Sequence, residues 1–244
     1  MTCVAATGPP RFSFKMVSMH IVVLTGAGIS RESGLKTFRD GDGLWAGHRI
    51  EDVCTPRALA RDPALVLDFY NMRRREVISA QPNAAHLALA QLQDHHRVDI
   101  ITQNVDDLHE RAGSQSVLHL HGEVLKSRSM RDFDVVVETR EDIHLGDVAP
   151  DGAQLRPHIC FFEETPYRWD EALNLSLDAD LFVVVGTSLQ VYPAAGLVDI
   201  TRADRVVLID PNPPALGTLL GRLEVIAEPA SEGVPKFVAA LAGN

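Results

Sequence analysis

Residues 20–28 read HIVVLTGAG, an apolar run of strand length that passes directly into a glycine-containing loop. The run is nearly continuous and rich in β-branched side chains, which is typical of a strand buried on both faces of a parallel sheet. Glycines let the main chain approach a bound group closely, and the amides that open a following helix favour an anion such as a pyrophosphate. The spacing is not a strict GxGxxG, because Arg31 stands at the third position. A tight turn without a ligand is therefore the alternative interpretation of this loop.

Four further apolar runs of strand length follow along the chain. They are residues 98–101, 117–120, 181–185 and 205–209. Helix-length segments lie between them, among them residues 63–79 and 83–93, and the first of these begins with an Asp-Pro start signal. Strands that alternate with helices form parallel sheets, so we predict an α/β fold with helices on both faces of the sheet.

Each of the five apolar runs is followed at once by small or polar residues. They are residues 25–28, 102–104, 121–122, 186–188 and Asp210. In an open parallel sheet, ligands bind in the crevice beyond the carboxyl ends of the strands, where residues of this kind would meet. Polar clusters at five strand ends therefore indicate one shared binding site.

Two stretches do not fit the sheet and predict a smaller module that faces its ligand edge. Residues 45–85 are typical of short helices, and residues 122–166 form a polar, charged insert with one β-like run at 133–138. Residues 1–18 show no clear periodicity and are expected to be a flexible leader. The sheet part then comprises about 19–44, 86–121 and 167–244.

The composition excludes several classes of protein. The chain has 244 residues, of which 45% are hydrophobic and 23% charged, and a formal net charge of −10. That apolar content excludes a disordered chain, and three scattered cysteines exclude a disulfide scaffold. Binding of a phosphate backbone needs clustered Lys and Arg, so an acidic chain argues against nucleic acid as a partner. No apolar run of about 18 residues could span a bilayer, and no signal peptide precedes the first strand, so we expect a cytoplasmic protein without membrane attachment.

Residues 26–45 read GAGISRESGLKTFRDGDGLW, which resembles the opening signature of the sirtuins, a family of NAD-dependent protein lysine deacylases. Four later blocks agree and come in the family's order. They are residues 82–86 (PNAAH), 102–109 (TQNVDDLH), 119–123 (HLHGE) and 186–195 (GTSLQVYPAA). The likeness runs from about Met19 to the end of the chain. It implies a Rossmann-like domain and a smaller module, with NAD bound between them.

The resemblance assigns NAD binding to residues of the glycine loop and of the other strand ends. They are Gly26, Ala27, Gly28, Ser30, Thr37, Phe38, Arg39, Gln103, Asn104, Asp106, Gly186, Thr187, Ser188, Asp210 and Ala230. Many sirtuins have asparagine where Asp210 stands, but a carboxylate accepts a hydrogen bond from a ribose hydroxyl equally well.

His119 and His121 lie two residues apart and would share one face of a strand. A histidine chosen blindly is more often a satisfied or surface side chain than a catalytic base. His121, however, ends a strand beside a glycine and matches the sirtuin base, a role that suits a neutral imidazole with a pKa near ~6.5. The resemblance also implies that Gln103, Asn104 and Asp106 hold the nicotinamide, its ribose and an attacking water, with Asn104 and Asp106 catalytic. The alternative for these side chains is that they cap a loop.

Tyr70 and Arg73 are three residues apart on the predicted helix at 63–79 and so share one face. From spacing alone, the favoured interpretation is a half-buried tyrosine and a solvated arginine. The Tyr-x-x-Arg pair, however, resembles the acyl-pocket signature of the sirtuin branch that removes succinyl, malonyl or glutaryl groups. An acyl chain that ends in a carboxylate needs a planar bidentate cation and a hydroxyl donor in an otherwise apolar tunnel. The resemblance therefore predicts acidic acyl groups as preferred substrates.

Residues 159–164 resemble the sirtuin strand that pairs with the substrate peptide, so Ile159, Phe162 and Glu164 are predicted to bind it. Glutamate stands at position 163, where glycine is usual in the family, and glycine often marks a close backbone approach. Cys160 is predicted to be a small packed residue rather than a nucleophile, because nothing basic beside it in the sequence would lower its pKa.

Most sirtuins hold a zinc ion in the insert with two CxxC pairs, but this chain has no cysteine between Cys54 and Cys160. Ser129 stands where the first ligand would align. His144 and His158 are two candidate ligands, whereas a structural zinc site needs four and is usually rich in cysteine. We predict that the insert holds no metal and keeps its shape by packing.

The resemblance implies an enzyme that uses NAD to remove succinyl, malonyl and also acetyl groups from protein lysines. Its products would be nicotinamide, free lysine and 2′-O-acyl-ADP-ribose. A plain deacetylase or a protein ADP-ribosyltransferase at the same NAD site is one alternative, and the products distinguish them. A non-catalytic NAD or ADP-ribose sensor is another, although a sensor has no need of a base such as His121. The sequence does not define the protein targets or the oligomeric state.

Overall fold

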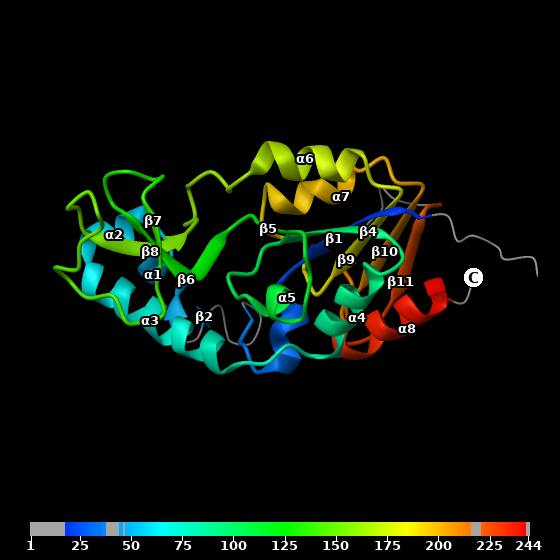
Figure 1. The fold of residues 1–244 in the computed structure, drawn as a ribbon, viewed down its shortest axis with the longest axis horizontal. Coiled ribbons are helices and arrows are strands. Elements are labelled where there is room, and N and C mark those ends of the chain that lie inside the picture. Colours follow the sequence, from blue (N-terminus) through cyan, green and yellow to red (C-terminus); the bar gives the residue numbers. More distant parts are fainter. Residues whose placement is uncertain (1–17, 38–43, 46, 216–220, 243–244) are drawn as a thin grey trace, which may run out of the picture.

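The computed structural model describes residues 18–37, 44–45, 47–215 and 221–242 (Figure 1). Nearly all of the predicted leader, together with Phe38 and Arg39, lies outside the described residues. The strands are β1 His20–Thr25, β2 Leu44–Trp45, β3 His48–Arg49, β4 Arg97–Thr102, β5 Val117–His119, β6 Gly122–Ser129, β7 Val136–Glu138, β8 Leu155–Ile159, β9 Leu181–Val185, β10 Arg205–Ile209 and β11 Leu223–Ile226. The helices are the 3₁₀ helices η1 Ala27–Ser33 and η2 Ala194–Gly196 and the α-helices α1 Ile50–Val53, α2 Pro56–Arg61, α3 Pro63–Ser79, α4 Ala84–Leu92, α5 Leu108–Arg111, α6 Trp169–Leu177, α7 Leu197–Ile200 and α8 Ala230–Ala242.

A six-stranded parallel sheet organises the larger part of the molecule, in the order β11-β10-β9-β1-β4-β5. In its register Ile21 of β1 lies opposite Val98 of β4 and Leu181 of β9. All five residues of β9 are buried, as expected of a continuous apolar run. The five predicted strands and the parallel sheet are confirmed, whereas β11 was not predicted because this edge strand is half exposed.

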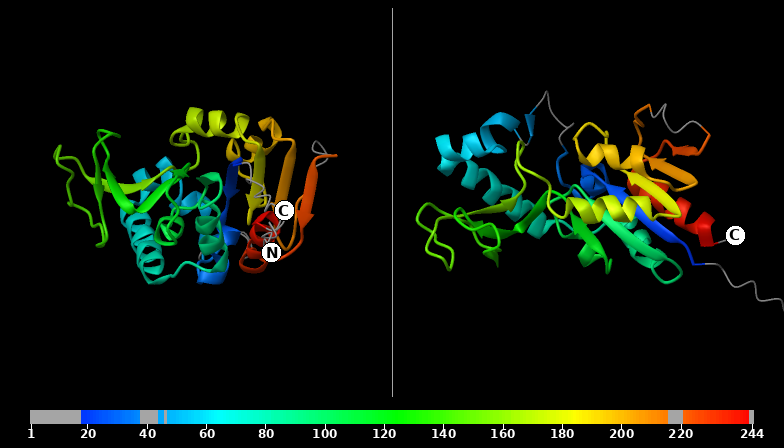
Figure 2. Two further views of the ribbon diagram at one scale, coloured as in Figure 1. Left: turned by 45° about the vertical axis from the view of Figure 1, so that its right-hand side comes forward. Right: turned by 90° about the horizontal axis from the view of Figure 1, so that it is seen from above.

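Helices cover both faces of this sheet, as the sequence predicted (Figures 1 and 2). Successive residues of a strand point to opposite faces, so Val23 and Val22 belong to different cores. The core around Val23 includes Leu89 of α4 and Phe237 of α8. The core around Val22 includes Leu197 of α7.

The smaller module lies at one end of the sheet and has its own core (Figure 1). It combines α1, α2 and α3 with the three-stranded antiparallel sheet β7-β6-β8. The side chain of Asp62 accepts a hydrogen bond from the N–H of Leu65 at 3.1 Å, which caps α3 as the start signal predicted. Phe69 of α3 and Ile159 of β8 meet in the module core. The division of the chain at particular residues stays a prediction.

Buried polar groups of α3 attach the insert to the helices. Asn71 donates from Nδ2 to the carbonyl of Ile143 and accepts the N–H of the same residue at Oδ1, both at 2.9 Å. Arg74, fully buried, donates from Nε to the carbonyl of Val124 at 2.9 Å and from Nη1 to Oδ1 of Asn71 at 2.7 Å. These bonds satisfy main-chain groups of the insert that packing alone would leave without partners.

The insert differs from the sequence expectation in two ways. Strands β6 and β8 were not predicted, and the run at 133–138 forms only the short β7. The expectation of a strand through residue 164 was wrong, because β8 ends at Ile159 and a turn follows. Glu163 has φ 76° in this turn, and the carboxylate of Glu164 accepts the N–H of Phe161 at 2.8 Å, which closes it.

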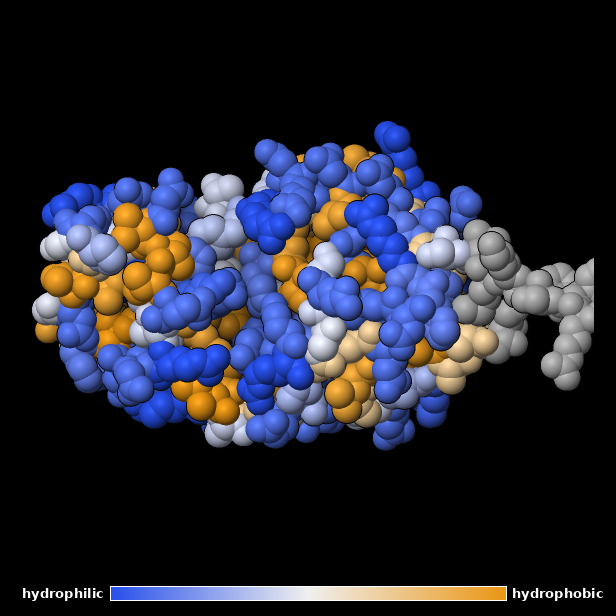
Figure 3. All heavy atoms as spheres, in the orientation of Figure 1, coloured by the Kyte–Doolittle hydropathy of each residue, from blue (hydrophilic) through white to orange (hydrophobic). Residues whose placement is uncertain are grey.

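Exposed large apolar side chains are concentrated on the insert. Met130, Phe133, Leu145 and Val148 are between 48% and 60% exposed. Apolar side chains gather at the left of Figure 3, where the smaller module lies. Over the described ranges, every helix is too short or too polar to cross a bilayer, and the expected cytoplasmic location stays a prediction.

Candidate active site

A cavity of about 530 Å³ lies where the sheet edge meets the smaller module. Loops that follow β1, β4, β9 and β10 form one wall, as the polar strand ends predicted. Of the predicted site residues that the structure describes, all line this cavity except Tyr70. A single concave site of this size is the usual form of a small-molecule site.

The glycine loop owes its glycines to a close contact between two strand-end loops. Gly28 donates its N–H to the carbonyl of Gly186 at 2.8 Å. A Cβ on Gly28 would lie 2.7 Å from the Cα of Gly186, closer than two carbon atoms can pack. Gly186 itself has φ 62°, which favours glycine. The main chain from Gly26 to Gly28 therefore lines the cavity without a side chain between it and a ligand.

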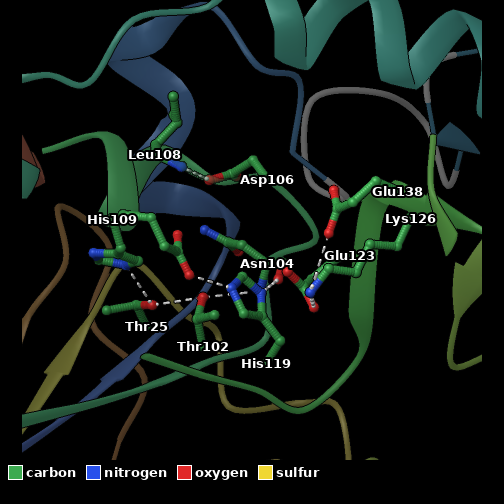
Figure 4. A network of polar contacts seen from close by, with 11 residues as sticks. Thr25, Thr102, Asn104, Asp106, Leu108, His109, His119, Glu123, Lys126 and Glu138 are labelled. Atoms are coloured by element: carbon green, nitrogen blue, oxygen red, sulfur yellow. Dashed lines mark hydrogen bonds and ion pairs between the residues drawn. The ribbon is translucent and has the colours of Figure 1, made fainter. Parts of the chain in front are cut away.

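Asn104, Ser30 and Asp106 form a buried hydrogen-bonded chain at the cavity wall. Nδ2 of Asn104 donates to the carbonyl of Gly26 and lies equally close, at 3.2 Å, to Oγ of Ser30. Oγ of Ser30 donates to Oδ2 of Asp106 at 3.0 Å. The N–H of Leu108 reaches Oδ1 of Asp106 at 3.2 Å, as Figure 4 shows. Burial raises the pKa of Asp106, although these hydrogen bonds act in the opposite direction.

His121 is placed to accept a proton from a ligand in the cavity. Its Nδ1 lies 3.0 Å from the carbonyl oxygen of Gln103. A carbonyl can only accept, so Nδ1 carries the proton in the neutral ring and Nε2 has the free lone pair. Burial lowers the pKa of His121 below its ordinary value, which keeps the ring neutral at pH 7. The geometry thus leaves Nε2 as the nitrogen of the ring that can accept a proton.

His119 has a different environment and does not line the cavity. Its Nε2 lies 2.7 Å from Oε1 of Glu110, and its Nδ1 lies 3.1 Å from the carbonyl of Asn104. Burial acts to lower the pKa of His119, but the Glu110 carboxylate raises it above its ordinary value. His119 is therefore an ion-paired structural residue that supports the loop after β4 (Figure 4).

The far end of the cavity has polar groups suited to a ribose and its neighbours. Nε2 of Gln103 donates to Oγ1 of Thr187 at 3.2 Å, which links the loops after β4 and β9. Asp210 is 3% exposed, and its Oδ1 accepts the N–H of Asn212 at 2.8 Å. Ala230 begins α8 at the cavity wall. These groups could bind hydroxyl groups of a dinucleotide, as the sequence resemblance implies.

The end of the cavity nearest α3 combines apolar walls with one buried cation. Arg73 is 4% exposed and lines the cavity, so the alternative of a solvated arginine is wrong. Tyr70 is fully buried behind the wall, and its hydroxyl donates to Sγ of Cys54 at 3.1 Å. Cys54 lines the cavity and was missed from the sequence, since a lone cysteine gives no signal there. Phe161, stacked on Tyr70 with ring centroids 5.7 Å apart, completes this wall.

Comparisons with known proteins agree with this geometry. A model of the Sir2 family matches residues 26–193, more than half of the chain. A protein of Aggregatibacter actinomycetemcomitans named NAD-dependent protein deacylase is 56% identical over 193 residues, covering 79% of this chain and 93% of its own. The chain belongs to the Sir2 family.

Solved sirtuin structures extend the likeness to three dimensions. The crystal structure of a Sir2 homologue in complex with NAD is 37% identical, with a TM-score of 0.82 over 91% of this chain and 89% of its own. A Sir2 protein bound to an acetylated peptide is 30% identical, with a TM-score of 0.76 over 91% of this chain and 93% of its own. The glycine-lined wall and the buried Asp210 of the present sirtuin fit a dinucleotide of the same kind.

In this sirtuin the segment expected to bind peptide is held by charged side chains. Oε1 of Glu164 accepts Nη1 of Arg156 at 2.8 Å and Nη2 of Arg128 at 3.3 Å. The guanidinium of Arg156 also lies over the ring of Phe161, 3.9 Å from its centroid. The carboxylate of Glu164 thus binds arginine side chains of the protein itself, while Ile159 and Phe162 present apolar surface to the cavity.

The insert of this sirtuin does not fit a zinc ion. The described residues contain no group of three His, Cys, Asp or Glu side chains that could hold a metal. At the position where the first ligand would align, Ser129 donates to Oδ2 of Asp151 at 2.6 Å. His158 packs against Tyr167 with ring centroids 4.6 Å apart, and His144 is exposed. Burial raises the pKa of the Cys160 thiol to about 12, which disfavours the thiolate that a nucleophile needs.

Proposed function

We propose that this sirtuin uses NAD to remove acyl groups from protein lysines, and that it prefers acyl groups that end in a carboxylate, such as succinyl and malonyl. The relatives named NAD-dependent protein deacylases support the first part. The observation that carries the second part is Arg73, a buried cation in the wall of the cavity that also contains His121.

In the proposed reaction, NAD supplies the ribose carbon to which the acyl oxygen bonds as nicotinamide leaves. His121 accepts a proton at Nε2 from a ribose hydroxyl, because its Nδ1 proton is held by Gln103. Proton transfer of this kind contributes roughly 10²–10⁴ to a rate. Asn104 and Asp106 hold the loop beside this hydroxyl through their bonds to Ser30, and so fix the two substrates in orientation.

The acyl group would lie against Cys54, Val77 and Phe161, with its end near Arg73. In such an apolar surrounding, a hydrogen bond between a guanidinium and a carboxylate is worth roughly 1.5–3 kcal/mol. An acetyl group has no atoms that could use this bond. A preference of ten-fold or more for acidic acyl groups is therefore the expected result.

The test is a mass-spectrometric assay of one lysine peptide carrying acetyl, malonyl or succinyl groups, with NAD. We expect succinyl and malonyl turnover above acetyl, and loss of that advantage in Arg73→Met. The matched control is Arg75→Met on the same helix, since the Arg75 side chain is 59% exposed and pairs with Asp142 instead. Acetyl turnover well above succinyl, or intact succinyl turnover in Arg73→Met, would contradict the acyl preference. ADP-ribose attached to protein would point instead to a transferase, and binding without turnover to a sensor.

A further inference from the structure

Arg73, the buried cation at the end of the cavity nearest α3, already forms an ion pair within the protein. Nη1 of Arg73 donates to Oε2 of Glu76 at 2.5 Å, one helical turn further along α3. The side chain of Arg73 is 5% exposed, whereas that of Glu76 is 36% exposed. The guanidinium therefore lies at the cavity, and its carboxylate partner extends toward solvent.

Other carboxylates beside this wall have partners of their own. Glu164 is held by Arg156 and Arg128, as described above. Glu163 accepts Nη2 of Arg57 at 2.5 Å on the surface. Glu76 thus compensates the charge of Arg73 when the cavity holds no acidic acyl group.

Two carboxylates around one guanidinium repel each other, and the repulsion is strong where little water screens it. An acidic acyl group must therefore share Arg73 with Glu76 or displace it. Displacement is possible because Glu76 can turn into water, where its charge is solvated. A neutral acyl group requires no such change and leaves the buried cation compensated, which avoids the cost of an unpaired charge.

We infer that Glu76 determines how strongly this sirtuin prefers acidic to neutral acyl groups, because it competes with the acyl carboxylate for Arg73. The inference rests on the proposed function, since it requires that acyl carboxylates bind Arg73. It assigns Glu76 as a specificity-determining residue, although Glu76 itself does not line the cavity. Its effect belongs to binding of the acyl group and not to the chemical step.

The test compares kcat/KM for succinyl and acetyl versions of one peptide in the wild type and in Glu76→Gln. We expect the succinyl-to-acetyl ratio to rise roughly tenfold, which corresponds to about 1.4 kcal/mol, mainly through a lower KM for the succinyl peptide. Glu76→Asp, which withdraws the carboxylate by one methylene, should raise the ratio less. The matched control, Asp68→Asn, removes an exposed charge from the same helix and should leave the ratio unchanged.

The outcomes separate this inference from the proposed function. If Arg73→Met loses succinyl turnover but Glu76→Gln leaves the ratio unchanged, the competition by Glu76 is refuted and the acyl preference stands. A lower ratio in Glu76→Gln also refutes it, because Glu76 would then position Arg73 for the substrate. If Arg73→Met keeps full succinyl turnover, the proposed acyl preference itself fails.

Discussion

Oγ of Ser129 lies 2.6 Å from Oδ2 of Asp151, and this bond joins two parts of the insert that are 22 residues apart. The same Oγ accepts the N–H groups of Arg131 at 2.9 Å and of Asp132 at 3.2 Å. Oδ1 of Asp151 accepts the N–H of Ala153 at 3.0 Å. Hydrogen bonds thus close the insert at the position where a zinc ligand would align.

Ser129→Ala should destabilise the protein, because it removes this bond and leaves two main-chain N–H groups without their acceptor. In a chain of this size each kcal/mol lost lowers Tm by roughly 2–4 °C, so calorimetry should detect a fall of several degrees. The control is Ser114→Ala, a buried serine whose Oγ has no partner among the described residues, which should change Tm little. The wild-type Tm should not change with a chelator; a zinc ion per chain, lost together with folding, would contradict this account.

Glu164→Ala should destabilise the smaller module more than a surface change does. Arg128 and Arg156 are 1% and 5% exposed, and without Glu164 neither would have a carboxylate partner among the described residues. Removal of one partner from such a buried cluster typically costs about 3 kcal/mol or more in the free energy of unfolding, which urea titration measures. A normal free energy of unfolding with a raised peptide KM would instead show that Glu164 acts only on the substrate.

The matched control for Glu164→Ala is Glu163→Ala, a substitution of the neighbouring residue. Glu163 pairs with Arg57, but their side chains are 51% and 80% exposed, and exposed ion pairs contribute about 1 kcal/mol at most. Glu163→Ala keeps the left-handed backbone strain at this position, so it tests the ion pair alone. We expect little change in the free energy of unfolding.

Strands and site residues that belong to a local sequence pattern could be predicted from the sequence. The central strands are continuous apolar runs, and the glycine loop and His121 carry family motifs. Strands β6 and β8 were missed because Arg128 and Arg156 give the insert a polar sequence, although the structure buries both against aromatic rings. The role of Cys54 depends on its contact with Tyr70 of α3, 16 residues away in the sequence, which no local spacing reveals. Glu76 follows Arg73 by three residues on the predicted helix, so the spacing indicates this ion pair, but the sequence analysis missed it.

His121→Asn should lower kcat/KM by roughly 10²–10⁴ and leave ADP-ribose binding intact. In the wild type the base works as the neutral ring, and burial lowers the pKa of His121 below 6.5. The plot of kcat/KM against pH should therefore fall on its acid side with an apparent pKa under 6.5. His144→Asn, at an exposed position of the insert, is the control. An acid-side fall in kcat/KM with an apparent pKa above 7, or full activity in His121→Asn, would exclude His121 as the base.

His86 should make the protein less stable in acid. It is fully buried, and its Nδ1 accepts the N–H of Asn83 at 3.3 Å in the capping box of α4. Nε2 has no partner among the described residues, and the His109 ring lies 4.9 Å away, centroid to centroid. Burial lowers the pKa of His86 from 6.5 to about 4. The folded ring therefore stays neutral at a pH at which the unfolded chain is already protonated.

The unfolded state binds this proton first, so the contribution of His86 to the free energy of unfolding should fall as the pH drops from about 6.5 and level off below about 4. At about 1.4 kcal/mol per pKa unit, the loss is on the order of 3 kcal/mol. His86→Gln removes the titration, and glutamine keeps an acceptor for the capping box. Urea titrations from pH 7 to pH 4 should therefore show a shallower decline in His86→Gln than in the wild type. His95→Gln, at an exposed position, should decline like the wild type; equal slopes in all three proteins would exclude His86 as the source of acid sensitivity.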